Sequence, residues 1–530
     1  MHDAAPLRLP PRSRPALLAA VALLLCSLQS LAAAPGEGSV AEEPSTAGAG
    51  EQRAPHRFVS EHQGTFGGRA LRYRAIAGET FLYDDEQQPK AAIFTFAYLE
   101  IDPPRAKPVA FVWNGGPGSS SVWLHMGTFG PRRVVVPSDA RSAGAPPYPI
   151  EDNGLTPLDL VDMVFVDPVG TGYSRALGEH EPKEFWSLDG DAASIAELIR
   201  AFVTEHGRWN AAKYLIGESF GSTRAAAVAD LLEGRGSVSL NGLILVSQAL
   251  DYQGSTPAHD NLRSYLTYLP TLAATAWYHG KIERMGTAAT LEGLLDETRR
   301  FAYDEYGSAL LRGSSLPAGE RVRIRDRLAA LTGLDPAYIE RSDLRPLADR
   351  FRKELLREKG LAVGRLDGRY TGDDLDDVAE RPAGDPAGDA IDSAYAAALH
   401  EVMRGELGVD LPTMQYNLSG PPELGQSWSY RPEGGGWWEP SYVNVARRLA
   451  EAMSRNPELE VLVANGYYDF ATPFFDAEVT FDRHGIPRER VQFTYYEAGH
   501  MMYLHHPSHE RFLADVRAFL ERTLAVAGVP

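Results

Sequence analysis

The sequence predicts an α/β fold with a mostly parallel central sheet, helices on both faces, and an inserted, mainly helical cap. Short apolar runs alternate with helical stretches toward both ends of the chain, which is typical of parallel strands joined by helical crossovers. Residues that could carry chemistry directly follow several of these runs, where open α/β sheets place their sites. The 530 residues are enough for a large core and an insertion.

The elements can be taken in chain order. The first part of the core is predicted to contain strands at 108–112, 161–166, 213–216 and 243–246, and helices at 188–204 and 223–232. Residues 152–160 are predicted to form a loop. From about 251 to 410 the chain is helical, charged and short of β runs, as in Leu311–Leu331, where arginines alternate with apolar positions. Strands at 461–466 and 491–496 then return to the core. We therefore predict a cap inserted between two parts of the core.

The strand at 213–216 and the helix at 223–232 are joined by Gly217-Glu218-Ser219-Phe220-Gly221. A Gly-x-Ser-x-Gly sequence between a strand and a helix is typical of a nucleophile elbow, which exposes a serine hydroxyl above the end of a sheet. The glycines are needed because the turn is tight. By itself the pentapeptide is also compatible with an ordinary strand-to-helix turn.

Two later residues supply partners for Ser219. Asp469 follows the strand at 461–466, and His500 follows the strand at 491–496. The chain order serine, aspartate, histidine is that of the α/β hydrolases. Serine needs an imidazole to take its proton, and the imidazole needs a carboxylate to orient it and to stabilise its cation. The sequence therefore predicts a catalytic triad of Ser219, Asp469 and His500.

A glycine-rich loop follows the strand at 108–112 and runs from Trp113 to Ser121. A tetrahedral intermediate needs preorganised donors for its oxyanion, and the backbone amides of such a loop can supply one of them. The amide after the nucleophile, that of Phe220, supplies the other in this fold. The loop lacks the spacing and the lysine of a phosphate-binding P-loop, so we favour an oxyanion hole.

Four segments together resemble the serine carboxypeptidases: 114–120, 167–174, 217–221 and 498–501. The resemblance spans about residues 108 to 507, apart from the predicted cap. It implies an exopeptidase that removes one residue from a free carboxyl terminus. It also implies roles for individual residues: Ser219 as nucleophile, His500 as general base and acid, Asp469 as its orienter, Gly116 and Phe220 as oxyanion donors, and Asn114 and Glu218 as the pair that binds the substrate's terminal carboxylate.

Substrate binding by Asn114 and Glu218 is expected to depend on pH. A carboxylate can bind another carboxylate only if one of them is protonated, and burial favours the protonated form. Substrate affinity should therefore fall as pH rises through the pKa of Glu218. The chain departs from the family at Ser119, where many relatives have cysteine, and at Thr128, where many have a glutamate of the same network. We expect a thinner carboxylate site and no strongly acidic optimum.

The amino terminus resembles an export signal, with a basic start, an apolar run from Ala16 to Leu28 and small residues at Ala32–Ala34. The run is too short to span a membrane. The one cysteine, Cys26, lies within it, so the mature chain can form no disulfide. An exported, cysteine-free enzyme indicates a bacterial periplasmic or secreted protein. The expected parts are a signal peptide, a disordered linker, core, cap and core, at 1–34, 35–56, 57–250, 251–410 and 411–530.

Charge and composition restrict the partners. The formal net charge is −19, and near −21 without the signal region, which carries three arginines against one aspartate. This excess argues against nucleic acid and anionic membranes as partners, and no membrane anchor is expected. The acidic run 373–377 lacks the spacing of a calcium loop, and His505 and His506 have no third ligand spaced for zinc. We expect a peptide substrate and no metal or cofactor.

Two other functions remain open. An esterase or acyltransferase would use the same triad and acyl-enzyme with a different acceptor, and only Asn114 and Glu218 favour peptides over these. A non-catalytic binding module on the same scaffold is the second alternative. The presence of every catalytic candidate argues against it.

Overall fold

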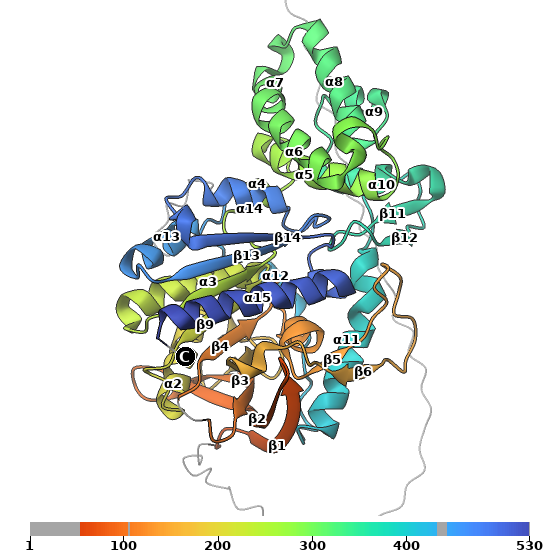
Figure 1. Ribbon diagram of the computed structural model, residues 1–530. Helices are drawn as coiled ribbons and strands as arrows, with labels where there is room; N and C mark the ends of the chain where they lie inside the picture. The colour runs from red at the N-terminus through yellow and green to blue at the C-terminus, as the bar shows by residue number, and fades with distance from the viewer. Residues whose placement is uncertain (1–52, 104–105, 432–441, 529–530) are drawn as a thin grey trace, which may run out of the picture. The chain divides into compact units, whose positions relative to one another are not determined.

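The computed structural model describes residues 53–103, 106–431 and 442–528 (Figure 1). The predicted signal at 1–34, and the predicted linker up to residue 52, lie outside the described residues. No helix in the described part of the chain combines the length and apolar character needed to cross a lipid bilayer.

The large sheet has the strand order β1-β2-β3-β7-β4-β9-β10-β13-β14, and the short β8 pairs with β3. From β7 to β14 neighbouring strands are parallel, whereas β1, β2 and β3 form an antiparallel amino-terminal meander. The strands are β1 (Arg57–Phe66), β2 (Arg69–Tyr83), β3 (Pro89–Glu100), β4 (Val109–Trp113), β7 (Asp162–Val166), β8 (Arg175–Ala176), β9 (Lys213–Glu218), β10 (Gly242–Val246), β13 (Glu460–Gly466) and β14 (Val491–Tyr496).

The predicted fold class is confirmed, and each of the six predicted strands is present within one or two residues of its expected bounds. Every residue of β4, β7, β9 and β10 is buried, as expected for parallel strands covered on both faces. Such strands are continuous apolar runs, which is why the sequence predicts them well. The meander β1–β3 was not predicted, because the exposed and half-buried residues of β1 give no apolar run.

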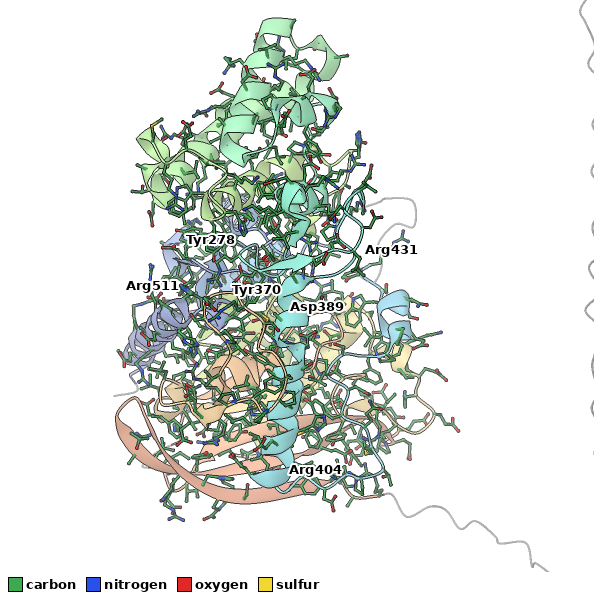
Figure 2. The ribbon with its side chains drawn as sticks, turned by 90° about the vertical axis from the view of Figure 1, so that its right-hand side faces the viewer. Tyr278, Tyr370, Asp389, Arg404, Arg431 and Arg511 are labelled. Carbon is green, nitrogen blue, oxygen red and sulfur yellow. The ribbon has the colours of Figure 1, made fainter. Side chains whose placement is uncertain are left out.

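Alternate residues of one strand pack into different apolar clusters. In β9, Tyr214 and Ile216 belong to one cluster and Leu215 to the other, because successive side chains of a strand point to opposite faces. The first cluster includes α11 (Pro386–Gly405) and α15 (His506–Val526), and the second includes α2 (Leu188–Glu205), α3 (Phe220–Leu231) and α13 (Ala446–Arg455). Figure 2 shows α11 with Asp389 near its start and Arg404 in its last turn.

Between β10 and β13 the chain forms a third apolar cluster from short helices (Figure 1). It also includes Phe470 and Phe474, which follow β13. The stretch 311–331 is not one helix: α7 ends at Arg312, Gly313 has φ 50°, and α8 begins at Ala318. The helices of this insertion before α11 are α4 (Tyr252–Ser255), α5 (Leu262–Tyr278), α6 (Leu291–Phe301), α7 (Gly307–Arg312), α8 (Ala318–Thr332), α9 (Pro336–Arg341) and α10 (Ala348–Glu354).

Several smaller elements complete the described chain. The predicted loop at 152–160 contains one short turn, η2 (Pro157–Asp159). Near the site lie α1 (Val122–Leu124) and the π-helical turn η1 (His125–Phe129). The others are the hairpins β5 (Arg132–Val134) with β6 (Ile150–Asp152) and β11 (Leu361–Val363) with β12 (Thr371–Asp373), then α12 (Pro422–Ser427) and α14 (Phe474–Phe481).

Candidate active site

Ser219 lies at the turn between β9 and α3 with φ 61° and ψ −129°. A positive φ is strained for a residue with a side chain, so surrounding contacts must hold it. The Ser219 amide donates to the Val246 carbonyl at 3.0 Å, and the Ser222 amide donates to the Ser219 carbonyl at 2.8 Å. A Cβ on Gly217 would lie 2.1 Å from the Gly221 carbonyl oxygen, so this position requires glycine. The turn has the geometry of a nucleophile elbow.

Asp469 and His500 form a buried pair at the carboxyl ends of β13 and β14. His500 Nδ1 lies 2.7 Å from Asp469 Oδ2, and the Thr472 hydroxyl donates to the same oxygen at 2.8 Å. The other carboxylate oxygen accepts the amides of Ala471 and Thr472 at 2.7 and 3.0 Å. Because a carboxylate faces Nδ1, that nitrogen carries the proton and Nε2 is left as an acceptor.

The charge of Asp469 also sets the basicity of His500. Burial lowers the pKa of the His500 imidazole, but the Asp469 carboxylate, with a smaller contribution from Glu218, more than offsets this, and the pKa is raised overall. A raised pKa makes the imidazole a stronger base toward a serine hydroxyl.

Consecutive residues of β10 and its turn hold Ser219 and His500 in one site. Val246 accepts the Ser219 amide, and the next residue, Ser247, donates its hydroxyl to the His500 carbonyl at 2.7 Å. Within residues 53–103, 106–431 and 442–528, the Ser219 hydroxyl makes no direct hydrogen bond to the His500 ring. Catalytic hydrogen bonds in ligand-free enzymes are often long and shorten when substrate binds.

The predicted oxyanion loop lies against the start of α3. A Cβ on Gly115 would be only 2.5 Å from the Phe220 amide nitrogen, so the two backbones are in contact. Gly116 is exposed and has φ 103°. Amides in the first turn of a helix have no partner within the helix and lie at the positive end of its dipole. The residue that precedes Gly116 thus contacts the Phe220 amide, so the two predicted oxyanion donors lie on adjoining backbone segments.

A buried carboxylate anchors this loop. Asp167 Oδ1 accepts the amide and the hydroxyl of Ser121, both at 2.8 Å, and Asp167 Oδ2 accepts the Tyr416 hydroxyl at 2.8 Å. Burial raises the pKa of Asp167 to about 6. The segment 167–174, which contributed to the predicted family resemblance, thus supports the loop.

Asn114 and Glu218 lie in contact, and we call them the carboxylate-binding pair after the role that the sequence predicts for them. Asn114 Nδ2 donates to Glu218 Oε1 at 2.8 Å, and Asn114 Oδ1 accepts the Leu124 amide at 3.0 Å, which fixes the orientation of the side-chain amide. Burial raises the pKa of Glu218 to about 7, although the His500 ring and the hydrogen bonds of Asn114 and Tyr503 act in the opposite direction.

A buried tyrosine beside this pair was not predicted from the sequence. The Tyr503 hydroxyl donates to Glu218 Oε2 at 2.8 Å. The expectation of a thinner site rested on Thr128 alone and took no account of this tyrosine. Its only signal in the sequence is its position, three residues after His500.

Residues 365–369 of the insertion hold the two turns that carry Asp469 and His500, and this segment was also missed. The Leu366 carbonyl accepts the His500 amide at 2.6 Å, the Asp367 carboxylate accepts the Gly499 amide at 2.9 Å, and the Arg365 carbonyl accepts the Phe470 amide at 3.0 Å. Arg369 pairs with Asp367 at 2.6 Å, and both side chains are buried. No motif marks this segment, because its role depends on contacts between distant parts of the chain.

Residues 79–289 match the family model described as serine carboxypeptidase. Over this stretch, about two fifths of the chain, the sequence is similar to the serine carboxypeptidases. The matched residues include the elbow, the oxyanion loop and the carboxylate-binding pair, while Asp469 and His500 lie beyond them. With the sheet topology, the match makes the chain a serine hydrolase of the α/β-hydrolase fold.

No curated protein matches the chain. Among solved structures, proline iminopeptidase from Mycobacterium smegmatis is similar at 18% identity, with 86% of this chain and 99% of that chain covered and a TM-score of 0.37. Juvenile hormone epoxide hydrolase from the silkworm Bombyx mori is similar at 13% identity, with 86% and 80% covered and a TM-score of 0.34.

Proposed function

We propose that this serine hydrolase is a carboxypeptidase that removes the last residue of peptides with a free carboxyl terminus. The observation that carries the proposal is the buried 2.8 Å contact between Asn114 and Glu218, since Glu218 immediately precedes the candidate nucleophile Ser219. A buried acid and amide next to a nucleophile suit a substrate whose negative charge lies one residue from the bond that is cleaved.

The proposed reaction begins when Ser219 Oγ attacks the carbonyl carbon of the last peptide bond and its proton passes to His500 Nε2. Asp469 stabilises the imidazolium. The amides of Gly116 and Phe220 donate to the oxyanion. Collapse of the intermediate breaks the C–N bond, and His500 gives its proton to the departing amine. Water, deprotonated by His500, then attacks the acyl-enzyme and releases the shortened peptide.

The carboxylate-binding pair gives this reaction its pH dependence. Protonated Glu218 can donate to the substrate carboxylate, and Asn114 Nδ2 has a second hydrogen to offer. Because the pKa of Glu218 is about 7, most of the acid is protonated in mildly acidic solution and ionised above neutrality. Affinity for a free-acid peptide should therefore weaken as pH rises through about 7.

The test compares an amino-blocked dipeptide with the same dipeptide bearing a terminal amide, between about pH 4 and about pH 9. Release of the last residue from the free acid alone, lost in Ser219→Ala, supports the carboxypeptidase. Rapid hydrolysis of a simple ester, with neither peptide cleaved, would replace the proposal with an esterase. Absence of any turnover and of labelling by a fluorophosphonate would indicate a binding module.

We also propose that the mature chain is exported, on the basis of the basic start, the apolar run and the small residues at 32–34. Expression of the full chain in a bacterial host, followed by amino-terminal sequencing of the periplasmic and secreted fractions, tests this. Recovery of only the uncleaved chain from the cytoplasm would reject it.

A further inference from the structure

We propose that Tyr503 is a positioning residue for the substrate's terminal carboxylate, holding Glu218 in place where a second acid is absent at Thr128. The inference deepens the proposed function and rests on it. Tyr503 lies in η10 (Met502–Leu504), three residues after His500. One short segment therefore places both the candidate general base and this hydroxyl in the site. The side chain is 2% exposed, and its ring therefore cannot swing away from the site.

The contacts of Glu218 show what the tyrosine adds. Each carboxyl oxygen has one donor: Oε1 accepts from Asn114 and Oε2 accepts from Tyr503, both at 2.8 Å. With both oxygens held, the plane of the carboxyl group is fixed. A fixed plane means that a proton on Glu218 points in a defined direction instead of rotating with the side chain.

The turn that carries Thr128 supports the ring of Tyr503. A Cβ on Gly127 would lie 2.6 Å from Tyr503 Cε2 and 2.8 Å from the Tyr395 hydroxyl, so the tyrosine packs directly on this glycine. Thr128, the next residue, is fully buried, and its hydroxyl has no hydrogen-bond partner among the residues that the structure describes. The hydrogen bond to Glu218 Oε2 therefore comes from η10, and Thr128 contributes none.

The Tyr503 phenol gives Glu218 a hydrogen-bond donor that carries no negative charge. Two acids and a substrate carboxylate would bring three negative charges together, which requires low pH. With Tyr503 the groups facing Glu218 are Asp469 and His500 from the turns after β13 and β14, Tyr503 from η10 and Tyr395 from α11. Uptake of a single proton by Glu218 then suffices for binding, so a free carboxylate can be bound close to neutral pH.

The test is made in the Ser219→Ala background, where binding is read without turnover. Calorimetry compares an amino-blocked dipeptide acid with its amide over a range of pH, with and without Tyr503→Phe. We expect the phenylalanine variant to lose roughly tenfold of the preference for the acid, as for loss of one hydrogen bond to an ionisable group. We also expect the decline of acid affinity to move to higher pH, because the tyrosine hydrogen bond lowers the pKa of Glu218.

Two further variants separate this role from packing. Tyr496→Phe removes a matched hydrogen bond, from a buried tyrosine to the Asp515 carboxylate at 2.8 Å, and should leave both the preference and its pH dependence unchanged. Difluorotyrosine at position 503, a stronger donor, should move the decline of acid affinity to lower pH. It also provides a test if the phenylalanine variant does not fold.

The outcomes distinguish the inference from the proposed function. In one outcome, the wild type cleaves no peptide while the Ser219→Ala protein prefers the acid to the amide in a Tyr503-dependent way. That result supports the inference about Tyr503 and contradicts the proposed carboxypeptidase activity. If Tyr503→Phe leaves the preference and the pH of its decline unchanged, Tyr503 only packs and the inference is wrong. If acid and amide bind equally with Tyr503 intact, the carboxylate-binding pair and the inference both fail.

Discussion

The backbone carbonyl of Leu366 accepts the amide of His500 at 2.6 Å, although the two residues lie in different parts of the chain. The hydrogen bond makes a segment of the insertion part of the support for the candidate general base. Gly499, the preceding residue, fits against the same segment: a Cβ there would be 2.3 Å from the Leu366 carbonyl oxygen and 2.4 Å from Asp367 Cβ.

We therefore expect Gly499→Ala to displace His500, because the backbone of Leu366 cannot move aside without releasing the His500 amide. The variant should lose about 100-fold in kcat/KM and about 1 to 3 kcal/mol of unfolding free energy. Gly319→Ala is the control, since Gly319 lies in α8 and an added Cβ there would meet no atom of the described residues within 4 Å. It should be neutral or slightly stabilising. Equal activity of the two variants would show that the contact with Leu366 does not position His500.

Glu218→Gln should remove the pH dependence of substrate binding. In the wild type, KM for a free-acid peptide should rise as pH passes about 7, because ionised Glu218 repels the substrate carboxylate. Glutamine donates at every pH, so KM of the variant should stay level. The acid limb of kcat, which reports the enzyme–substrate complex, should stay in place, because Glu218 is already protonated and neutral in that complex. Steady-state kinetics across this range measure both effects, and a KM that still rises near pH 7 would assign the titration to another group.

Arg365→Gln should move the acid limb of kcat/KM to higher pH. Burial lowers the pKa of His500 and the Asp469 carboxylate raises it, with a raised pKa overall, and the positive charge of the exposed Arg365 side chain opposes this rise by a smaller amount. Removing that charge favours the imidazolium, so the base becomes protonated at a higher pH and activity is lost earlier on acidification. Arg381→Gln removes an exposed arginine from the same insertion and serves as the control. If the acid limb of kcat/KM lies at the same pH in the two variants, the charge of Arg365 does not affect the pKa of His500.

The elements that the sequence predicts are those that appear in it as local patterns, such as short apolar runs and compact motifs. The strands before Ser219 and Asp469 contain short apolar runs, the strand before His500 begins with alternating apolar and polar residues, and the elbow is a five-residue motif. Tyr503 and Leu366 could not be found in this way, because their roles arise from contacts between segments that share no repeat or motif. The break between α7 and α8 was missed although Gly313 and Pro317 are residues that commonly end and begin helices.

Asp476 gives a prediction about stability. It lies in the first turn of α14 and is 1% exposed. Within the described part of the chain neither carboxyl oxygen has a hydrogen-bond partner, although Arg263 Nη2 is 4.0 Å away. Burial raises its pKa to about 8, against the opposing effect of Arg263 and with a further rise from Asp251. The folded state therefore holds this proton more tightly than the unfolded state, in which the pKa is about 4.

Because the pKa is higher in the folded state, the contribution of Asp476 is fully favourable below about pH 4 and is lost as pH rises toward about 8. Asp476→Asn carries no such titration, so its stability relative to the wild type should increase steadily between these limits. Urea unfolding of both proteins at several pH values measures the difference. Parallel stability curves would show that Asp476 is already ionised in the folded protein, with Arg263 close enough to compensate its charge.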